Sequence, residues 1–179
     1  MDSQRRVENI ISRCKKGNGE AFSELIDMYA SRCYGYLYRL TGDSTTSNDL
    51  LSEVFVRLVE KISSYKGGSF EKWLFTIATN IFHDHLRQQY RQRRLLDAKV
   101  RELEAVRPQA RAEQELLDTV QIQLRKLDDD TAELLMMRFY SGLSFKELAE
   151  IRKEPIGTTL CKVHRGLKKL RELMGDTGD

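Results

Sequence analysis

The sequence predicts an all-α protein made of two small helical domains joined by a flexible linker, the second a helix-turn-helix. Apolar residues recur with a helical period along nearly the whole chain, whereas the alternation typical of strands is scarce. Apolar density falls from about residue 96 to residue 113, around Pro108, which indicates a linker. We therefore expect a first domain over residues 1–95 and a second over residues 114–179.

Two helices are expected at the start of the first domain. The first ends at residues 17–19, where two glycines favour a helix C-cap followed by a turn. The second is long and extends from about residue 21 to the break at residues 41–43. Its apolar stripe predicts one buried face, made of Phe22, Leu25, Ile26, Tyr29, Cys33, Tyr36, Leu37 and Leu40.

Two further helices complete this domain. Thr46 and Asp49 have the spacing of a capping box and predict the start of the third helix, which stops near Ser63. The loop at residues 64–68 contains two glycines and leads to Ser69, which we expect to be the N-cap of the fourth helix. That helix continues into a run of basic residues.

The second domain has the pattern of a helix-turn-helix. Residues 130–133 resemble an N-terminal cap, with acids at the positive end of the helix dipole. Ser144 and Glu147 form a capping box for a short helix, and Pro155 stands where the next helix would begin. A last helix from about residue 156 to 174, rich in Lys and Arg, then fits the DNA-binding helix of this motif.

Several protein classes are excluded by composition and motifs. No stretch approaches the roughly 18 consecutive apolar residues of a membrane span, and the N-terminus lacks the apolar core of a secretory signal. We therefore expect a cytoplasmic protein. The motifs of phosphate-binding loops, dinucleotide-binding folds and serine hydrolases are absent, so nothing in the sequence supports an enzyme.

Cysteine and histidine give no sign of a metal or redox site. The three cysteines have spacings that fit neither a disulfide framework nor a metal motif, and we expect Cys14 and Cys33 to be free thiols in the core. His83 and His85 flank Asp84, but residues two apart on a helix point to different faces. We expect no metal and no cofactor.

The net charge of +3 conceals two basic segments. Residues 83–94 contain four arginines and one acid, and residues 151–171 contain seven basic residues and one acid. Residues 116–150, in contrast, contain four basic and seven acidic residues. Because Lys and Arg release counterions when they neutralise phosphates, the second segment predicts a face that meets nucleic acid. For the first segment, a solvated charged face explains the charge equally well.

Aromatic residues lie beside the first basic segment. Aromatic rings next to basic residues are a common means of holding unstacked, single-stranded bases. Phe70 and Trp73 have helical spacing with Ile77 and are favoured as core residues, whereas Tyr65, in the loop, is the more exposed candidate.

Three segments carry a family resemblance. Its residues are Asp49, Leu50, Glu53 and Phe55, then Phe70, Trp73, Asn80, Asp84 and Arg87, and then Arg138, Gly142, Ser144, Glu147, Gly157, Thr158 and Arg165. The chain resembles bacterial RNA polymerase sigma factors of the small, two-domain extracytoplasmic-function (ECF) class, over nearly its whole length. Each motif is weak alone, but three in this order at the family's spacing are specific.

The resemblance implies three binding surfaces and no catalytic residue. The first domain would bind core RNA polymerase through Asp49, Leu50, Glu53, Val54 and Phe55. Its loop and fourth helix would capture an unpaired minus-ten base and hold the neighbouring backbone, through Tyr65, Lys66, Phe70, Trp73, Asn80, Asp84, Arg87 and Arg91. The last helix would approach the minus-thirty-five element through Thr158, Thr159, Lys162 and Arg165.

The function implied is that of an alternative sigma factor, which directs core polymerase to promoters and performs no chemistry itself. Its partners would be core polymerase, promoter DNA and an anti-sigma factor, often a membrane protein, that holds the sigma factor inactive. The chain departs from the family pattern at Lys153-Glu154, where a Gly and an apolar residue are usual, at Thr159, usually apolar, and at Cys161, usually small and polar.

Two other functions stay open at this point. A helix-turn-helix regulator that binds duplex DNA without polymerase explains residues 151–171 but neither residues 49–55 nor the loop with Gly67 and Gly68. A small helical hydrolase using His83, Asp84 and His85 would need further metal ligands, which the sequence does not offer.

Overall fold

The structure is a computed structural model, and it describes residues 2–102 and 119–175. These residues form helices and no strand, which confirms the predicted all-α class. The helices are α1 (Asp2–Lys15), α2 (Gly19–Thr41), α3 (Ser44–Lys61), α4 (Phe70–Glu102), α5 (Thr119–Leu124), α6 (Asp129–Ser141), α7 (Phe145–Arg152) and α8 (Ile156–Leu173), with a 3₁₀ turn at Ile62–Ser64. None of the described helices has the length and apolar content to cross a membrane.

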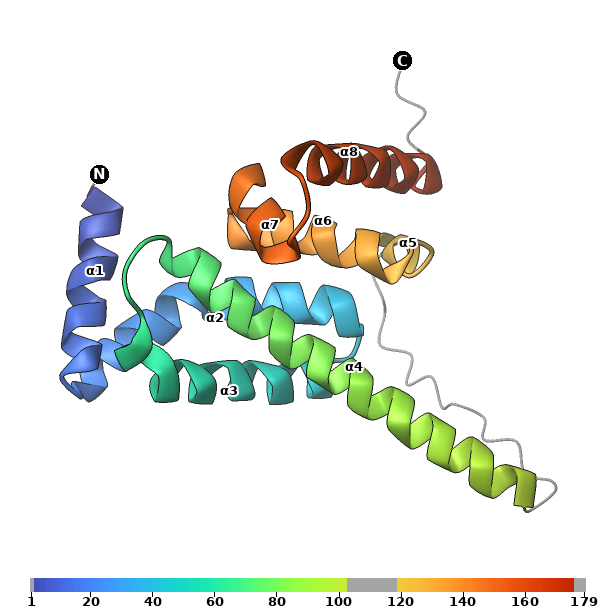
Figure 1. Ribbon diagram of the computed structural model, residues 1–179, viewed down its shortest axis with the longest axis horizontal. Helices are drawn as coiled ribbons and strands as arrows, with labels where there is room; N and C mark the ends of the chain where they lie inside the picture. The colour runs from blue at the N-terminus through green and yellow to red at the C-terminus, as the bar shows by residue number, and fades with distance from the viewer. Residues whose placement is uncertain (1, 103–118, 176–179) are drawn as a thin grey trace.

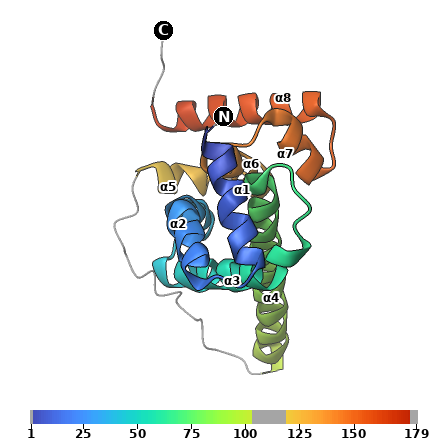
Figure 2. The ribbon, with the colours of Figure 1, turned by 90° about the vertical axis from the view of Figure 1, so that its left-hand side faces the viewer.

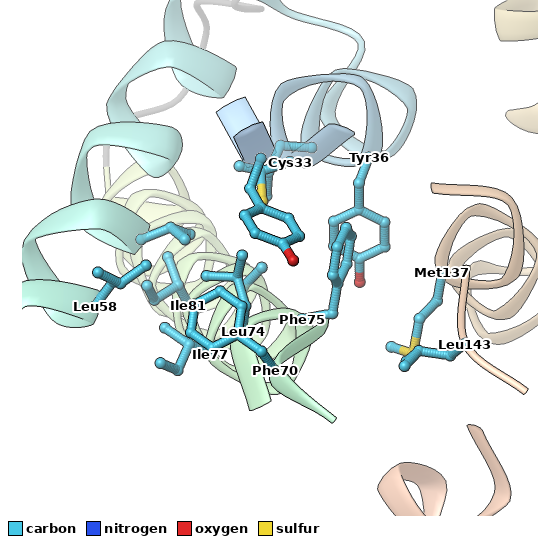
Figure 3. Close-up of a cluster of buried hydrophobic side chains, with 14 of the residues drawn as sticks. Cys33, Tyr36, Leu58, Phe70, Leu74, Phe75, Ile77, Ile81, Met137 and Leu143 are labelled. Atoms are coloured by element: carbon cyan, nitrogen blue, oxygen red, sulfur yellow. The ribbon is translucent and has the colours of Figure 1, made fainter. Parts of the chain in front are cut away.

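Helices α1–α4 form a first module around one apolar core. Cys14 and Cys33 are buried in this core as free thiols, as the sequence predicts. Burial raises the pKa of the Cys33 thiol to about 12, so it stays protonated. Figure 3 shows a part of the core where side chains from α2, α3 and α4 meet.

Both predicted ends of α2 are confirmed. The Asn18 side chain accepts a hydrogen bond from the Ala21 N–H at 2.8 Å and so caps the first turn. At the other end, Gly42 has a φ of 67° and donates its N–H to the Tyr38 carbonyl at 2.8 Å. A glycine adopts this left-handed conformation with little strain, and it turns the chain from α2 into α3.

Two of the predicted helix starts are correct. Ser69 precedes α4, and its hydroxyl accepts a hydrogen bond from the Lys72 N–H at 3.1 Å. Ser144 and Glu147 form the expected capping box at the start of α7, with both reciprocal hydrogen bonds present.

Two other predicted caps are wrong by two or three residues. Helix α3 begins at Ser44, and its cap is Asp43, which accepts from the Thr46 N–H at 2.6 Å. Helix α6 is capped by Asp128 rather than by Asp130. In both cases an aspartate upstream, an equally good N-cap, lies at the point where the chain leaves the turn.

The expected linker is only partly described. Helix α4 continues to Glu102, so residues 96–102 are helical rather than part of a linker. The remainder of the expected linker, residues 103–113, and the start of the expected second domain lie outside the described residues.

Helices α5–α8 form a second module with a helix-turn-helix. The turn between α7 and α8 contains Lys153 with a φ of 54°, the one described non-glycine residue with a positive φ. A left-handed residue at a helix C-terminus is usually glycine, because a Cβ is strained there. The departure from the family pattern at this position therefore retains the turn but adds strain to it.

The two modules pack directly against each other. Figures 1 and 2 show α3 on one side, α2 and α4 in the middle, α6 and α7 next to them, and α8 on the far side. Met137 and Leu143 of the second module are buried with Tyr36 and Phe75 of the first, and Figure 3 shows them facing each other. The buried core is therefore continuous from one module to the other.

Candidate nucleic-acid interface

The predicted polymerase-binding residues of α3 divide into an exposed and a buried set. Asp49 and Glu53 are exposed, and Phe55 is half-buried. Leu50 and Val54, in contrast, are 5% and 0% exposed and belong to the core. The two buried residues hold α3 against the module, while the carboxylates and the edge of Phe55 reach its surface.

Two valines on α3 extend this surface, although sequence reasoning did not assign them to it. Val56 is 58% exposed and Val59 is 46% exposed, so an apolar strip runs beside the carboxylates. Their three-residue spacing on one helix face was the available signal. It is ambiguous in a sequence, because the same spacing is typical of a buried face.

The loop before α4 is braced by three aromatic rings. Tyr65 lies 5.6 Å from Phe70 and 5.4 Å from Trp73 between ring centroids, and its hydroxyl donates to the Gly68 carbonyl at 2.7 Å. Tyr65 is only 6% exposed, so the expectation that it is the more accessible ring is wrong. Burial raises the pKa of its hydroxyl. Lys66 of the loop is exposed.

Behind this loop lies a cavity of about 590 Å³ between α1, the loop and α7. Tyr65, Ser69 and Phe70 line it from the loop and the start of α4. Glu8 of α1 and Glu147 of α7 line its other sides. The cavity is large enough for a planar heterocycle. Of the predicted minus-ten residues it brings together Tyr65 and Phe70, whereas Lys66 and Trp73 do not line it.

Four polar residues of the predicted minus-ten surface share one face of α4. Asn80, Asp84, Arg87 and Arg91 are three or four residues apart, and all four are exposed. Asp84 and Arg87 form an ion pair, and the hydrogen bond from Arg87 lowers the pKa of Asp84. This face is therefore open to a ligand along three turns of the helix.

The hydrolase alternative finds no support in this geometry. The Nε2 of His83 lies 2.7 Å from the Glu133 carboxylate of α6. The described part of the chain contains no group of three or more metal-ligating side chains.

The predicted minus-thirty-five residues also differ in how they are placed. Thr158 and Arg165 are exposed on α8. Thr159 is fully buried, and its hydroxyl donates to the Glu154 carboxylate at 2.9 Å, so it secures the turn rather than facing outward. The Lys162 ammonium donates to Glu154 at 2.7 Å and to Asp130 at 3.1 Å.

Glu154 is the centre of this charge network. It accepts from Thr159 and Lys162, and Arg152 lies 3.7 Å away. Burial alone would raise the pKa of Glu154, but the hydrogen bonds from Lys162 and Thr159 outweigh it and lower the pKa. The outer face of α8 adds the exposed residues Gly157, Cys161 and Lys168, together with His164, which the sequence did not assign to this surface.

Comparison with known proteins bears directly on these surfaces. The family model for Sigma-70 region 2 matches residues 25–92, and the model for Sigma-70 region 4 matches residues 123–172. The ECF RNA polymerase sigma factor SigW of Bacillus subtilis is 31% identical over 95% of this chain and 97% of its own length. The chain belongs to the ECF family of RNA polymerase sigma factors.

A further relative is similar in sequence, and two solved structures are similar in fold. The ECF sigma factor BldN of Streptomyces coelicolor is 32% identical over 98% of this chain and 68% of its own length. The sigma factor RpoE from Bartonella quintana, solved with the anti-sigma factor NepR, has a TM-score of 0.69 over 88% of this chain and 98% of that one, at 24% identity. CnrH, solved with the cytosolic domain of CnrY, has a TM-score of 0.67 over 94% of this chain and 97% of CnrH, at 20% identity.

The matched ranges fall one in each module of the structure. Region 2 covers most of α2, all of α3 and most of α4, and region 4 covers α6, α7 and nearly all of α8, while α1 lies outside both. All three candidate surfaces therefore lie within family-matched segments.

Proposed function

We propose that this ECF sigma factor binds core RNA polymerase, directs it to promoters and initiates transcription there, without catalysing a reaction itself. The observation that carries the proposal is the match of both sigma regions, in order, to modules that expose a surface on each of α3, α4 and α8. A regulator that acts without polymerase explains α8 but leaves the α3 surface without a role. The proposed site of action is the cytoplasm, where promoters and polymerase are found.

Each surface has a separate task in the proposal. The first domain, residues 1–95, docks on polymerase through Asp49, Glu53 and Phe55, which Leu50 and Val54 hold in place from the core. The cavity beside Tyr65 and Phe70 takes an unpaired base, and the polar face of α4 holds the strand beside it. The second domain, residues 114–179, reads the upstream element through Thr158, Arg165 and, once its ion pairs are released, Lys162.

An anti-sigma factor is the proposed regulator. RpoE, a protein of the same fold, was solved with the anti-sigma factor NepR, and CnrH, also of this fold, was solved with the cytosolic domain of CnrY. A factor of this kind that covers α3 or α4 would keep the chain from polymerase and promoter.

The polymerase surface is testable by charge reversal. Asp49→Arg combined with Glu53→Arg should reduce capture of the chain by immobilised core polymerase by at least about tenfold, since like charges across an interface cost several kcal/mol. Asp27→Arg, which reverses an exposed carboxylate on α2, is the matched control and should bind normally. Leu50→Asp is unsuitable, because a carboxylate in the core would unfold the module. Equal capture of the wild type, the Asp49→Arg/Glu53→Arg chain and Asp27→Arg would show that α3 does not bind polymerase.

A further inference from the structure

The N-terminal half of α8 exposes apolar side chains, whereas its C-terminal half exposes many basic ones. Ile156 is 49% exposed and Leu160 is 42% exposed. The two residues are four positions apart, so they are neighbours on one side of the helix. Farther along α8, the exposed side chains include Arg165, Lys168 and Lys169. We refer to Ile156 and Leu160 as the apolar pair.

The packing of α8 on α6 determines which residues of α8 point outward. Thr159 and Val163 are 0% and 5% exposed and form the buried side of the helix together with Gly166. A Cβ at residue 166 would lie 2.5 Å from Cγ2 of Thr131 on α6, so the two helices are in close contact there. Figures 1 and 2 show α8 as the outermost helix of the second module. The apolar pair is therefore held on the surface, because rotation of α8 about its axis is restricted.

The first turn of α8 is also fixed by the turn that precedes it. The Pro155 carbonyl accepts hydrogen bonds from the Thr158 N–H at 2.9 Å and from the Thr159 N–H at 3.1 Å. The Thr159 hydroxyl donates to the Glu154 carboxylate at 2.9 Å. The backbone that carries Ile156 is therefore ordered before a ligand binds, so a contact made there has a low entropic cost.

The exposed surface at this end of α8 is mainly apolar. Across residues 156–161, all of which the structure describes, no exposed side chain is charged; the exposed residues are Ile156, Gly157, Thr158, Leu160 and Cys161. Lys162, the next residue, donates to carboxylates of its own module. In a helix-turn-helix, the N-terminal residues of the second helix are those that contact base edges in the major groove. The segment in the position of base contact therefore offers few groups that can hydrogen-bond to a base.

Thymine is the base that an apolar side chain can recognise in the major groove. Its C5-methyl group projects into the groove, where the other three bases present hydrogen-bond donors and acceptors and no methyl group. The side chains of Ile156 and Leu160 have neither a donor nor an acceptor. Next to another base they would take its polar atoms away from water without replacing the lost hydrogen bonds, which costs affinity.

The charges around the apolar pair identify nucleic acid as its partner. Exposed cations lie on both sides of the pair along the chain, Lys153 in the turn before it and Arg165 after it. Such cations bind phosphates and fix the position of a helix on the duplex without reading its sequence. The apolar pair between them is then directed at the bases rather than at the backbone.

We propose that Ile156 and Leu160 are specificity-determining residues of this sigma factor, and that they select thymine in the upstream promoter element by contact with its C5-methyl group. The proposal rests on the proposed function, because it places α8 in the major groove of that element. Burial of one methyl group changes affinity by about fourfold, so each contacted thymine contributes a preference of about that size.

The test uses the full-length chain in complex with core polymerase, and an upstream element selected from a randomised DNA pool. Each thymine of the selected element is then replaced by deoxyuridine, which lacks the methyl group but keeps the same hydrogen-bonding atoms. Ile156→Ala combined with Leu160→Ala removes the apolar pair, and the double variant should fold because alanine at exposed helical positions favours the helix. Met174→Ala is the matched control, since Met174 is 44% exposed at the C-terminal end of α8.

Wild type and Met174→Ala should bind the thymine element about fourfold more tightly than the deoxyuridine element for each contacted methyl group. In the double variant this ratio of affinities should fall to about one, whereas a purely structural role of the pair would weaken binding of both DNAs alike. A selected element without thymine, a ratio of one in the wild type, or the same ratio in all chains would overturn the inference and leave the proposed function standing. Absence of any promoter complex with core polymerase would overturn the proposed function and the inference with it.

Discussion

The two candidate DNA-binding helices differ in how far their basic side chains are paired with carboxylates. On α4, Arg87 has one exposed partner, Asp84, and Arg91 has no ion pair among the described residues. On α8, Lys162 is held by two carboxylates, and nearby Arg152 is only 12% exposed and is paired with Asp130. The first surface is therefore ready to bind phosphate, whereas part of the second must first break bonds within its own module.

This difference changes the meaning of the charge count. The sequence assigns seven basic residues and one acid to residues 151–171, a larger excess than that of residues 83–94. Asp130 and Glu133 belong to α6, outside that segment, yet they lie against its cations. A count along the chain does not detect pairing between helices, so it overstates the free charge of α8.

The largest expected effect is on α4. Arg87→Ala combined with Arg91→Ala should lower the affinity of the polymerase complex for a promoter fragment by about tenfold to a hundredfold. It should also lower the slope of log affinity against log salt by about 2, because two phosphate contacts are lost. Filter binding at several salt concentrations measures both quantities. An unchanged salt slope would show that this face does not touch phosphate.

On α8, the exposed arginine should matter more than the paired lysine. Arg165→Ala should reduce affinity for a promoter with an upstream element by about tenfold, within the range of a base or phosphate contact. Lys162→Ala should cost only about threefold, since forming its DNA contact already requires loss of its bonds to Glu154 and Asp130. A larger loss of affinity in Lys162→Ala than in Arg165→Ala would show that pairing with carboxylates does not weaken the contribution of a cation to DNA binding.

Releasing the paired cations should have a smaller, opposite effect. Asp130→Asn removes the carboxylate that holds both Arg152 and Lys162 and should raise affinity for the same promoter by about threefold. Asp129→Asn, a neutralisation at the neighbouring exposed residue, is the control for the change in net charge. The same gain in both variants would assign the effect to net charge alone.

The smallest expected effect is on stability. Lys153→Gly removes a Cβ from a residue with a φ of 54° and should raise the free energy of unfolding by about 1 kcal/mol, or Tm by about 2–4 °C. Thermal unfolding followed by circular dichroism measures this change in Tm. Lys146→Gly, inside α7, is the control and should lower the free energy of unfolding by about 1 kcal/mol. A lower Tm for the position-153 variant would mean that the lysine side chain stabilises the turn.

The parts of the fold that local chemistry controls were predictable from the sequence. The glycine turn at Gly42, the cap at Ser69 and the capping box at Ser144 depend on residues a few positions apart, and all three are present. The caps placed at Thr46 and Asp130 are displaced because a competing aspartate lies just upstream. Boundaries of this kind depend on small energy differences between similar residues.

The burial or exposure of the site residues depends on contacts between residues that are distant in the sequence. Tyr65 has the neighbours of a loop residue, yet Phe70 and Trp73 enclose it. Leu50 and Asp49 are adjacent, and only the packing of α3 separates the buried one from the exposed one. The sequence around Gly35 does not show why a glycine is there. The side chain that a Cβ at this position would meet is Tyr140, more than one hundred residues later.

The proposed role in transcription is tested most directly in vitro, with purified core polymerase, this chain and a pool of promoter fragments. We expect the chain to form a complex with core polymerase and specific transcripts to appear only when both are present. Asp49→Arg combined with Glu53→Arg should abolish these transcripts, and Asp27→Arg should not. Absence of a complex with core polymerase, or the same transcripts from the Asp49→Arg/Glu53→Arg chain, would show that the chain does not act as a sigma factor through α3.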